Sequence, residues 1–280
     1  MTRARDRSAR DLSGLTVAVT GGARGIGEAT AARLHRAGAH VVIGDRDADL
    51  NARVAERLGV QAHPLDVTDT DSWREFVAAA GPLDVLVNNA GIMPIGSILK
   101  EPDEVTRTIL DVNVHGVILG TKAVVPGMVE RGGGHVVNVA SAVGRVATAD
   151  GATYSASKFA VVGFSEATRA ELAPLGIDVS MVMPTVVSTE LAAGVSQARF
   201  VRPVTADDVA EVIEATIRRP RPETWVPRWT QPMTKATSLL PRRVQDGMAR
   251  VFHADSILTD ADQTARAAYE ARARRASGRS

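Results

Sequence analysis

Short apolar runs alternate with helical patterns along most of this 280-residue chain, and no other feature limits its fold as strongly. The β-prone runs lie at 15–19, 40–43, 62–65, 83–87, 136–139, 179–182 and 224–226. Between them, apolar residues recur at helical spacing near 25–38, 49–58, 70–80, 103–130 and 155–174. Strands separated by helices of this length require a parallel sheet with right-handed crossovers. The sequence therefore predicts an α/β fold: a doubly wound parallel sheet of about seven strands with helices on both faces.

Three segments are expected along the chain. Residues 1–12 form a flexible, Arg-rich N-terminus, and residues 13–227 carry the whole strand and helix series. Within the second segment, Thr205-Ala-Asp-Asp208 has the pattern of a capping box that opens one more helix. Residues 228–280 remain as a C-terminal extension.

Composition excludes several classes of chemistry. The chain has no cysteine, so disulfides, thiolate metal sites and cysteine nucleophiles are excluded, and no His-Glu-x-x-His pattern indicates a metal. A net charge of +1 gives no general attraction to nucleic acid. The longest charge-free stretch, 85–99, is too short and too polar to span a bilayer. The Arg-rich start leads into no cleavable apolar region, and we expect a cytoplasmic protein.

A glycine-rich turn joins the first strand to the first helix. Gly21, Gly25 and Gly27 let the backbone turn tightly and approach a pyrophosphate, whose charge would meet free N–H groups at the helix N-terminus. Such glycines also occur in purely structural turns. Here the second strand ends on an acid, Asp45, placed to contact a ribose, so the context favours dinucleotide binding.

Tyr154 and Lys158 stand four residues apart, on one face of a predicted helix. The chain contains only two tyrosines and four lysines, so a chance pairing explains this spacing poorly. A tyrosine with an ordinary pKa near 10 is a weak acid and base at neutral pH, and a neighbouring ammonium can stabilise its anion. The pair is typical of acid/base chemistry on an oxygen.

With these residues and four further motifs, residues 13–227 resemble the short-chain dehydrogenase/reductase family in its compact single-domain form. The motifs are Asp66-Val67, Asn88-Asn-Ala-Gly91, Val112-Asn113-Val114, and Ser141 thirteen residues before the tyrosine. The resemblance implies a Rossmann-like, dinucleotide-binding catalytic domain. It also implies a catalytic tetrad of Asn113, Ser141, Tyr154 and Lys158.

The resemblance gives each member of the tetrad a role. Tyr154 would exchange a proton with the substrate oxygen, and Ser141 would orient that oxygen. Lys158 would bind the nicotinamide ribose and lower the tyrosine pKa, while Asn113 would hold a water that relays protons. Hydride would pass between the substrate carbon and the nicotinamide.

The resemblance also implies the residues that contact the cofactor. They are Gly21, Arg24, Gly25, Ile26, Gly27, Asp45, Asp66, Val67, Asn89, Ala90, Gly91, Tyr154, Lys158, Pro184, Val187 and Thr189. NAD is predicted over NADP because the Asp45 carboxylate would repel a 2′-phosphate, although Arg24 and Arg46 keep NADP open. One residue departs from the family: Thr185 stands where glycine is usual, so the local backbone and the space for substrate stay open questions.

The predicted function is an NAD(P)-dependent oxidoreductase that interconverts a secondary alcohol and a ketone. Apolar residues beside the expected pocket, namely Met93, Pro94, Ile95, Val143 and Val146, favour a lipophilic small molecule. The alternative is a non-catalytic dinucleotide sensor, which would need neither Tyr154 nor Ser141. A sugar epimerase or dehydratase would have a different glycine spacing and a further domain.

By resemblance, the chain should form a homotetramer or dimer through the helices near 103–130 and 155–174. Both helices carry apolar residues that we expect outside the core-facing stripe, namely Val124, Val125, Val161 and Val162.

The C-terminal extension carries ten basic and five acidic residues. Its apolar residues, Met233, Leu239, Leu240, Val244, Met248, Val251 and Phe252, have partly helical spacing. Three interpretations compete: a lid over the substrate, a basic surface for anionic lipid or an acyl carrier, and a packing arm. A lid or packing arm is favoured over membrane contact, because interfacial helices carry a longer apolar face.

Overall fold

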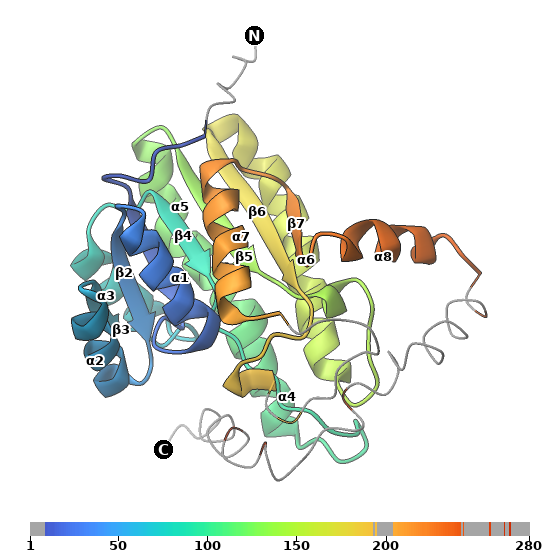
Figure 1. Ribbon diagram of the computed structural model, residues 1–280. Helices are drawn as coiled ribbons and strands as arrows, with labels where there is room; N and C mark the ends of the chain where they lie inside the picture. Colours follow the sequence, from blue (N-terminus) through green and yellow to red (C-terminus); the bar gives the residue numbers. More distant parts are fainter. Residues whose placement is uncertain are drawn as a thin grey trace.

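The computed structural model describes residues 9–192, 194, 204–241, 243, 258, 266 and 269. A seven-stranded, fully parallel sheet in the order β3-β2-β1-β4-β5-β6-β7 forms its centre (Figure 1). The strands are β1 (Thr16–Thr20), β2 (His40–Asp45), β3 (Gln61–Pro64), β4 (Val85–Asn88), β5 (Gly134–Val139), β6 (Ile177–Pro184) and β7 (Glu223–Val226). The predicted doubly wound sheet is confirmed.

Helices cover both faces of this sheet. They are α1 (Gly25–Arg36), α2 (Ala48–Leu58), α3 (Thr70–Ala80), α4 (Asp103–Leu110), α5 (Gly116–Glu130), α6 (Ala152–Leu172), α7 (Ala206–Arg218) and α8 (Thr230–Ser238). In Figure 1, α1 and α7 lie in front of the sheet and α5 and α6 behind it. The predicted capping box opens α7, since the Thr205 side chain accepts from the Asp208 N–H and the Asp208 side chain accepts from the Thr205 N–H.

The core follows the alternation of side chains along the strands. In β1, Val17 and Val19 pack with apolar residues of α1, α2 and α7, whereas Ala18 between them packs with α3 and α5. A third apolar cluster joins α6 to β6 and β7. Apart from the edge strand β3, whose residues are exposed or half-buried, the strands are thus largely buried on both faces, which explains why most strands appear in the sequence as continuous apolar runs.

One helical stretch of the described chain, Asp103–Glu130, is long and apolar enough by composition to cross a membrane. It consists of α4, a π-helical turn η1 (Asp111–His115) and α5. Half of its most apolar window is buried inside the protein, and Val124, Val125 and Met128 belong to the core. The stretch is therefore a core helix of this fold.

Packing corrects the prediction of which apolar residues face outward on the long helices. Val124, Val125, Val161 and Val162 are all buried in the subunit's own core. The residues left exposed on the same helical layer are Leu110 on α4, 40% exposed, and Phe159 on α6, 44% exposed. The helical spacing of apolar residues does not show which face of the helix a neighbouring element covers, so the prediction from the sequence was wrong here.

The folded unit begins before residue 13. Leu12 is fully buried in the core, and the Arg10 guanidinium pairs with the Asp178 carboxylate. The Arg10 N–H also donates to the Arg218 carbonyl. Residues 9–12 are thus packed against the domain, and residues 1–8 lie outside the described residues.

After β7 the chain forms α8, which projects from the body of the domain in Figure 1. Met233 on this helix is 48% exposed, and Leu239 beyond it is 86% exposed. The remaining members of the predicted apolar series, Val244, Met248, Val251 and Phe252, lie outside the described residues.

Candidate active site

A cavity of about 1400 Å³ lies along the carboxyl ends of the strands. In the sheet, β1 lies between β2 on one side and β4 on the other. The helices that follow β1 and β4 therefore leave the sheet in opposite directions at this point. Open α/β sheets bind their ligands in the crevice that this reversal creates. All predicted site residues except Gly27 and Asn113 line the cavity.

The glycine turn leaves room for a ligand at the start of α1. Gly21 and Gly25 have φ of 62° and 52°, which residues with a side chain rarely adopt. A Cβ on Gly27 would lie 2.0 Å from the Gly21 carbonyl oxygen. The turn is fixed from β4, where the Asn89 side chain donates to the Thr20 carbonyl over 2.9 Å. A negatively charged group placed here would meet the N-terminus of α1, so the turn fits a pyrophosphate.

Acidic and basic side chains gather where β2 ends. The Asp45 carboxylate accepts from the backbone N–H of Ala23 over 3.2 Å and of Asp47 over 3.1 Å. Arg24 turns toward acids, with its guanidinium 2.8 Å from the Asp47 carboxylate and 3.8 Å from that of Glu190. The pKa of Asp47 is lowered, mainly by the Leu50 N–H and further by Arg24. Asp45 is therefore held in place at the edge of the cavity.

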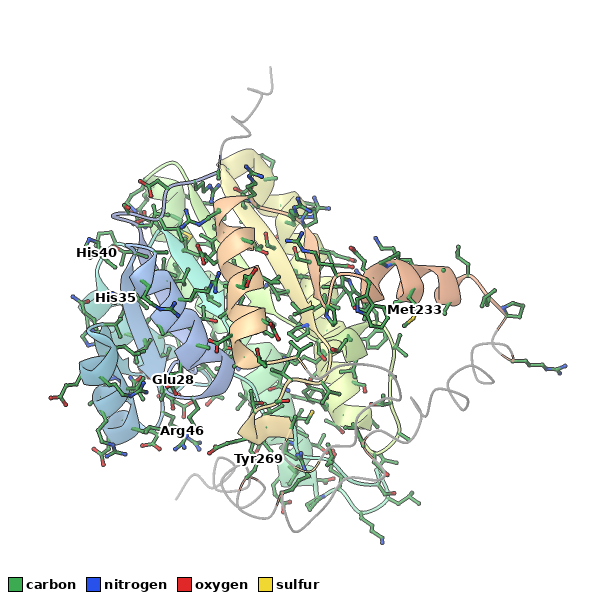
Figure 2. All side chains as sticks on the ribbon, in the orientation of Figure 1. Glu28, His35, His40, Arg46, Met233 and Tyr269 are labelled. Atoms are coloured by element: carbon green, nitrogen blue, oxygen red, sulfur yellow. The ribbon has the colours of Figure 1, made fainter. Side chains whose placement is uncertain are left out.

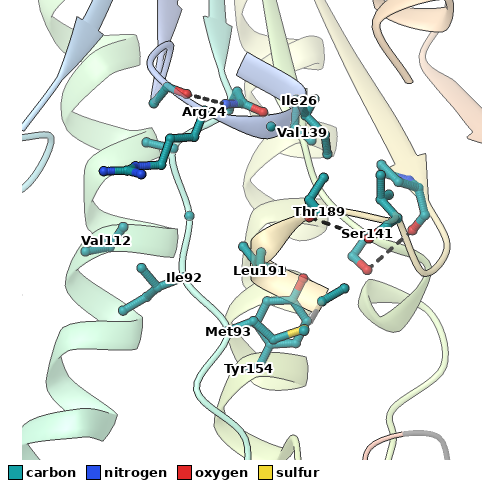
Figure 3. Close-up of a pocket in the computed structure, with 18 of the residues that line it drawn as sticks. Arg24, Ile26, Ile92, Met93, Val112, Val139, Ser141, Tyr154, Thr189 and Leu191 are labelled. Carbon is teal, nitrogen blue, oxygen red and sulfur yellow. Dashed lines mark hydrogen bonds between the residues drawn. The ribbon is translucent and has the colours of Figure 1, made fainter. Parts of the chain in front are cut away.

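The proposed acid/base sits on α6. Tyr154 is 7% exposed and lines the cavity, and Ser141, at the end of β5, lies beside it (Figure 3). Burial raises the pKa of Tyr154 to about 12, against a smaller lowering by its hydrogen bond with Ser141. The phenol is thus protonated at neutral pH, and the role of Ser141 in orienting a substrate oxygen stays a prediction.

Lys158 lies one helical turn from the tyrosine. Its ammonium donates to the Val139 carbonyl over 3.1 Å and stands 5.8 Å from the centre of the Tyr154 ring. Burial lowers the pKa of Lys158 to about 8. The pKa of Tyr154 is governed in this structure by burial and by the Ser141 hydrogen bond, and the lowering by Lys158 stays a prediction.

Asn113 lies behind the cavity and is fully buried in the π-helical turn η1. Its side-chain oxygen accepts from the Ile92 N–H over 2.8 Å, and its amide donates to the Ile92 carbonyl over 2.9 Å. The amide also donates to the Ser157 hydroxyl over 3.1 Å. The side chain thus fixes the loop after β4 against α6, and the water relay stays a prediction.

Thr185 fits without the backbone conformation that glycine would provide. Asp150 is the one residue other than glycine with a positive φ in the described part of the chain. The Thr185 N–H donates to the Val226 carbonyl over 3.0 Å, and its hydroxyl is 3.3 Å from the same oxygen. Its side chain lines the cavity and is anchored to β7.

Sequence motifs did not identify much of the cavity lining at the end away from the glycine turn. Met93, Val143 and Val146 line it as predicted, whereas Pro94 and Ile95 do not. The lining further includes Ile92, Leu191, Trp225, Thr230, Met233, Leu258 and Tyr269. Several of these lie beyond residue 220, where no motif indicates a position in the fold.

Known proteins similar in sequence to this chain are dehydrogenases. Residues 15–199 match the family model for short chain dehydrogenases. Among curated proteins, trans-4-hydroxycyclohexanecarboxylate dehydrogenase of Sinomonas cyclohexanicum is 35% identical over 70% of this chain and 80% of its own length. The 3-alpha-(or 20-beta)-hydroxysteroid dehydrogenase of Mycobacterium bovis is 41% identical over 64% of this chain and 72% of its own length.

A solved structure shares the fold. It is a short chain dehydrogenase/reductase from Burkholderia phymatum in complex with NAD, 24% identical, with a TM-score of 0.74. The match covers 81% of this chain and 93% of that one. At this identity the likeness concerns the fold alone.

Proposed function

The chain belongs to the short-chain dehydrogenase/reductase family of oxidoreductases, and we propose that it interconverts a secondary alcohol and a ketone with NAD as cofactor. One observation carries the proposal. Tyr154, Ser141 and Lys158 line the same cavity as the glycine turn, so an acid/base and a dinucleotide cradle face one space.

Tyr154 has the protonation state that ketone reduction needs. With its pKa raised to about 12, the phenol holds a proton at neutral pH and can deliver it to a ketone oxygen held by Ser141. In the reverse direction the tyrosine oxygen takes the hydroxyl proton. Lys158, with a pKa lowered to about 8, is mostly charged at pH 7 and can hold the ribose hydroxyls beside the tyrosine.

The cofactor fits residues that this chain supplies. Gly21, Gly25 and the start of α1 would hold the pyrophosphate, and Asp45 the adenosine ribose. When bound, a nicotinamide cofactor supplies a hydride donor or acceptor. NAD is favoured because two carboxylates, Asp45 and Asp47, lie at the end of β2 and would repel a 2′-phosphate there, and because Arg24 is paired with Asp47 and Glu190.

The substrate end of the cavity favours a lipophilic alcohol. Met93, Val143, Val146 and Leu258 present apolar side chains there, and Tyr269 adds an aromatic ring. The two relatives named above are, by name, dehydrogenases of a hydroxycyclohexanecarboxylate and of hydroxysteroids, which are alcohols built on aliphatic rings. An alicyclic secondary alcohol matches both the lining and these relatives.

Assembly and location complete the proposal. The exposed Leu110 and Phe159 favour a homo-oligomer, a dimer or tetramer formed through α4 and α6, rather than the valines named from the sequence. Light scattering at micromolar concentration tests this, and a monomeric mass would contradict it. The enzyme is proposed to act in the cytoplasm, which cell fractionation tests.

A turnover screen tests the function directly. The purified full-length protein is incubated with secondary alcohols, ketones and steroids, each with NAD or NADP and their reduced forms, while absorbance of the reduced nicotinamide is followed. We expect turnover of at least one alicyclic alcohol or its ketone. Binding of NAD without turnover of any compound would favour the dinucleotide sensor instead.

A further inference from the structure

Arg266 is a charged side chain with no exposure to solvent, and the mechanism above gives it no role. Its guanidinium donates to the Met93 carbonyl over 2.7 Å and to the Leu191 carbonyl over 3.1 Å. Burying a charge is costly unless hydrogen bonds compensate, so this position depends on these carbonyls. Arg266 is not part of the cavity lining, which excludes direct contact with substrate there.

The two carbonyls belong to loops that are far apart in the sequence. Met93 follows β4, and Leu191 lies in a single helical turn, Glu190–Ala192, after β6. Both side chains line the cavity, and Figure 3 shows them near Tyr154. A single guanidinium therefore joins two walls of the substrate end, with the planar fork of donors that an Arg, unlike a Lys, can offer.

Tyr269 adds a second connection to the same loop. Its hydroxyl accepts from the Met93 N–H over 2.6 Å, and the Arg266 guanidinium lies 5.2 Å from the centre of its ring. Both backbone groups of Met93 are thus bonded to residues three positions apart near the C-terminus. Figure 2 shows Tyr269 at the end of the molecule where the strands finish.

A third residue of this region closes the cavity beside the catalytic helix. Leu258 is 5% exposed and lines the cavity. A Cβ on Gly151, directly before α6, would lie only 2.5 Å from the Leu258 side chain. The C-terminal residues therefore contact the substrate end from the Met93 loop to the start of the Tyr154 helix.

We propose that Arg266 and Tyr269 form a C-terminal clamp that fixes the Met93 and Leu191 loops and sets the size of substrate the enzyme accepts. Arg266 is the positioning residue, because it acts through the two loops. Tyr269 is the specificity-determining residue, because its ring forms part of the wall. The kinetic part of this proposal rests on the proposed alcohol oxidoreductase function.

The kinetic test compares Arg266→Leu, Tyr269→Ala and Tyr269→Phe with wild type, each as full-length protein, on cyclohexanol and on a steroid alcohol. Arg266→Leu should raise KM for both alcohols about tenfold, the scale of losing one group from a substrate pocket, with the NAD Kd changed less than twofold. Tyr269→Ala should raise the ratio of kcat/KM for the steroid alcohol to kcat/KM for cyclohexanol about tenfold. Tyr269→Phe keeps the aromatic ring and should leave this ratio as in wild type.

Arg243→Leu is the matched control, because Arg243 is exposed in the same region. It should leave KM and the substrate ratio as in wild type. Unchanged KM and selectivity in Arg266→Leu and Tyr269→Ala, with normal NAD binding, would overturn the clamp. If Arg266→Leu does not fold, the two Tyr269 variants decide.

Amide exchange tests the clamp independently of turnover. Tyr269→Phe removes the acceptor of the Met93 N–H, so exchange at Met93 should become faster, while the Ile92 N–H, bonded to Asn113, should not change. Unaltered exchange at Met93 would contradict the clamp. An enzyme without alcohol turnover but with this exchange pattern would instead contradict only the proposed function.

Discussion

The two ends of the cavity are built differently. At the cofactor end, the Gly21 turn, Asp45 and Asn89 come from the ends of neighbouring strands, and the Asp45 and Asn89 side chains are hydrogen-bonded to the backbone of the turn over 2.9–3.3 Å. At the substrate end, Met93, Leu191 and Tyr269 come from segments up to 176 residues apart and are held by side-chain contacts. A substitution at the cofactor end should therefore weaken cofactor binding and affect every reaction of the enzyme, whereas one in the Arg266 and Tyr269 contacts should change the binding or choice of substrate and leave NAD binding nearly unchanged.

The largest effect on cofactor binding should follow from filling the turn. In Gly27→Ala the new Cβ would lie 2.0 Å from the Gly21 carbonyl oxygen, and backbone cannot move aside as a flexible side chain can. Overpacking of about 1–3 kcal/mol, if it falls on the bound state, corresponds to an NAD Kd about 5- to 150-fold weaker. Isothermal titration measures it. Gly133→Ala, where the new Cβ finds no atom closer than 3.8 Å, is the control. An unchanged Kd in Gly27→Ala would refute the cradle.

The pH dependence of kcat tests the role of Tyr154 in proton transfer. Alcohol oxidation needs an unprotonated Tyr154, and its pKa is raised to about 12. The unprotonated fraction rises about tenfold per pH unit below that pKa, so kcat for oxidation should increase from pH 7 toward pH 9. Ketone reduction uses the protonated form and should show no such rise. Oxidation rates that stay flat over this range would show that Tyr154 does not limit the proton transfer.

A smaller effect should separate the two cofactors. Asp45→Asn removes the charge that disfavours a 2′-phosphate, so the NAD to NADP ratio of kcat/KM should fall by about tenfold, or about 1.4 kcal/mol. The exposed Asp49→Asn, which does not line the cavity, should leave the ratio unchanged. A wild-type kcat/KM higher with NADP would contradict the predicted preference at once.

The residues predicted for the cofactor end lie together along one cavity, whereas most of the residues at the other end were missed, for a physical reason. Gly21, Asp45 and Asn89 lie next to strands whose alternation with helices fixes the topology, so a parallel sheet brings them together. Leu191, Leu258 and Tyr269 have no such constraint, because their places follow from long-range packing. The composition of the C-terminal extension favoured a lid or packing arm but did not indicate which of its basic residues would be buried, and Arg266 is fully buried.

Two local misjudgements have the same origin. Val124 and Val161 lie on helix faces covered by the subunit's own sheet, which a helical repeat alone does not reveal. Leu12 packs into the core although its neighbours are charged. In each case burial depends on which element packs against the residue in the folded chain, whereas the sequence pattern predicts only the secondary structure.

The central claim is that Tyr154 transfers the substrate proton, and one paired measurement on Tyr154→Phe tests it most directly. The substitution removes the hydroxyl and keeps the ring, so kcat for the best alcohol of the screen should fall on the order of 100-fold or more. The NAD Kd, measured on the same sample, should stay within about twofold of wild type, because the glycine cradle is untouched. An unchanged kcat with normal NAD binding would contradict the account.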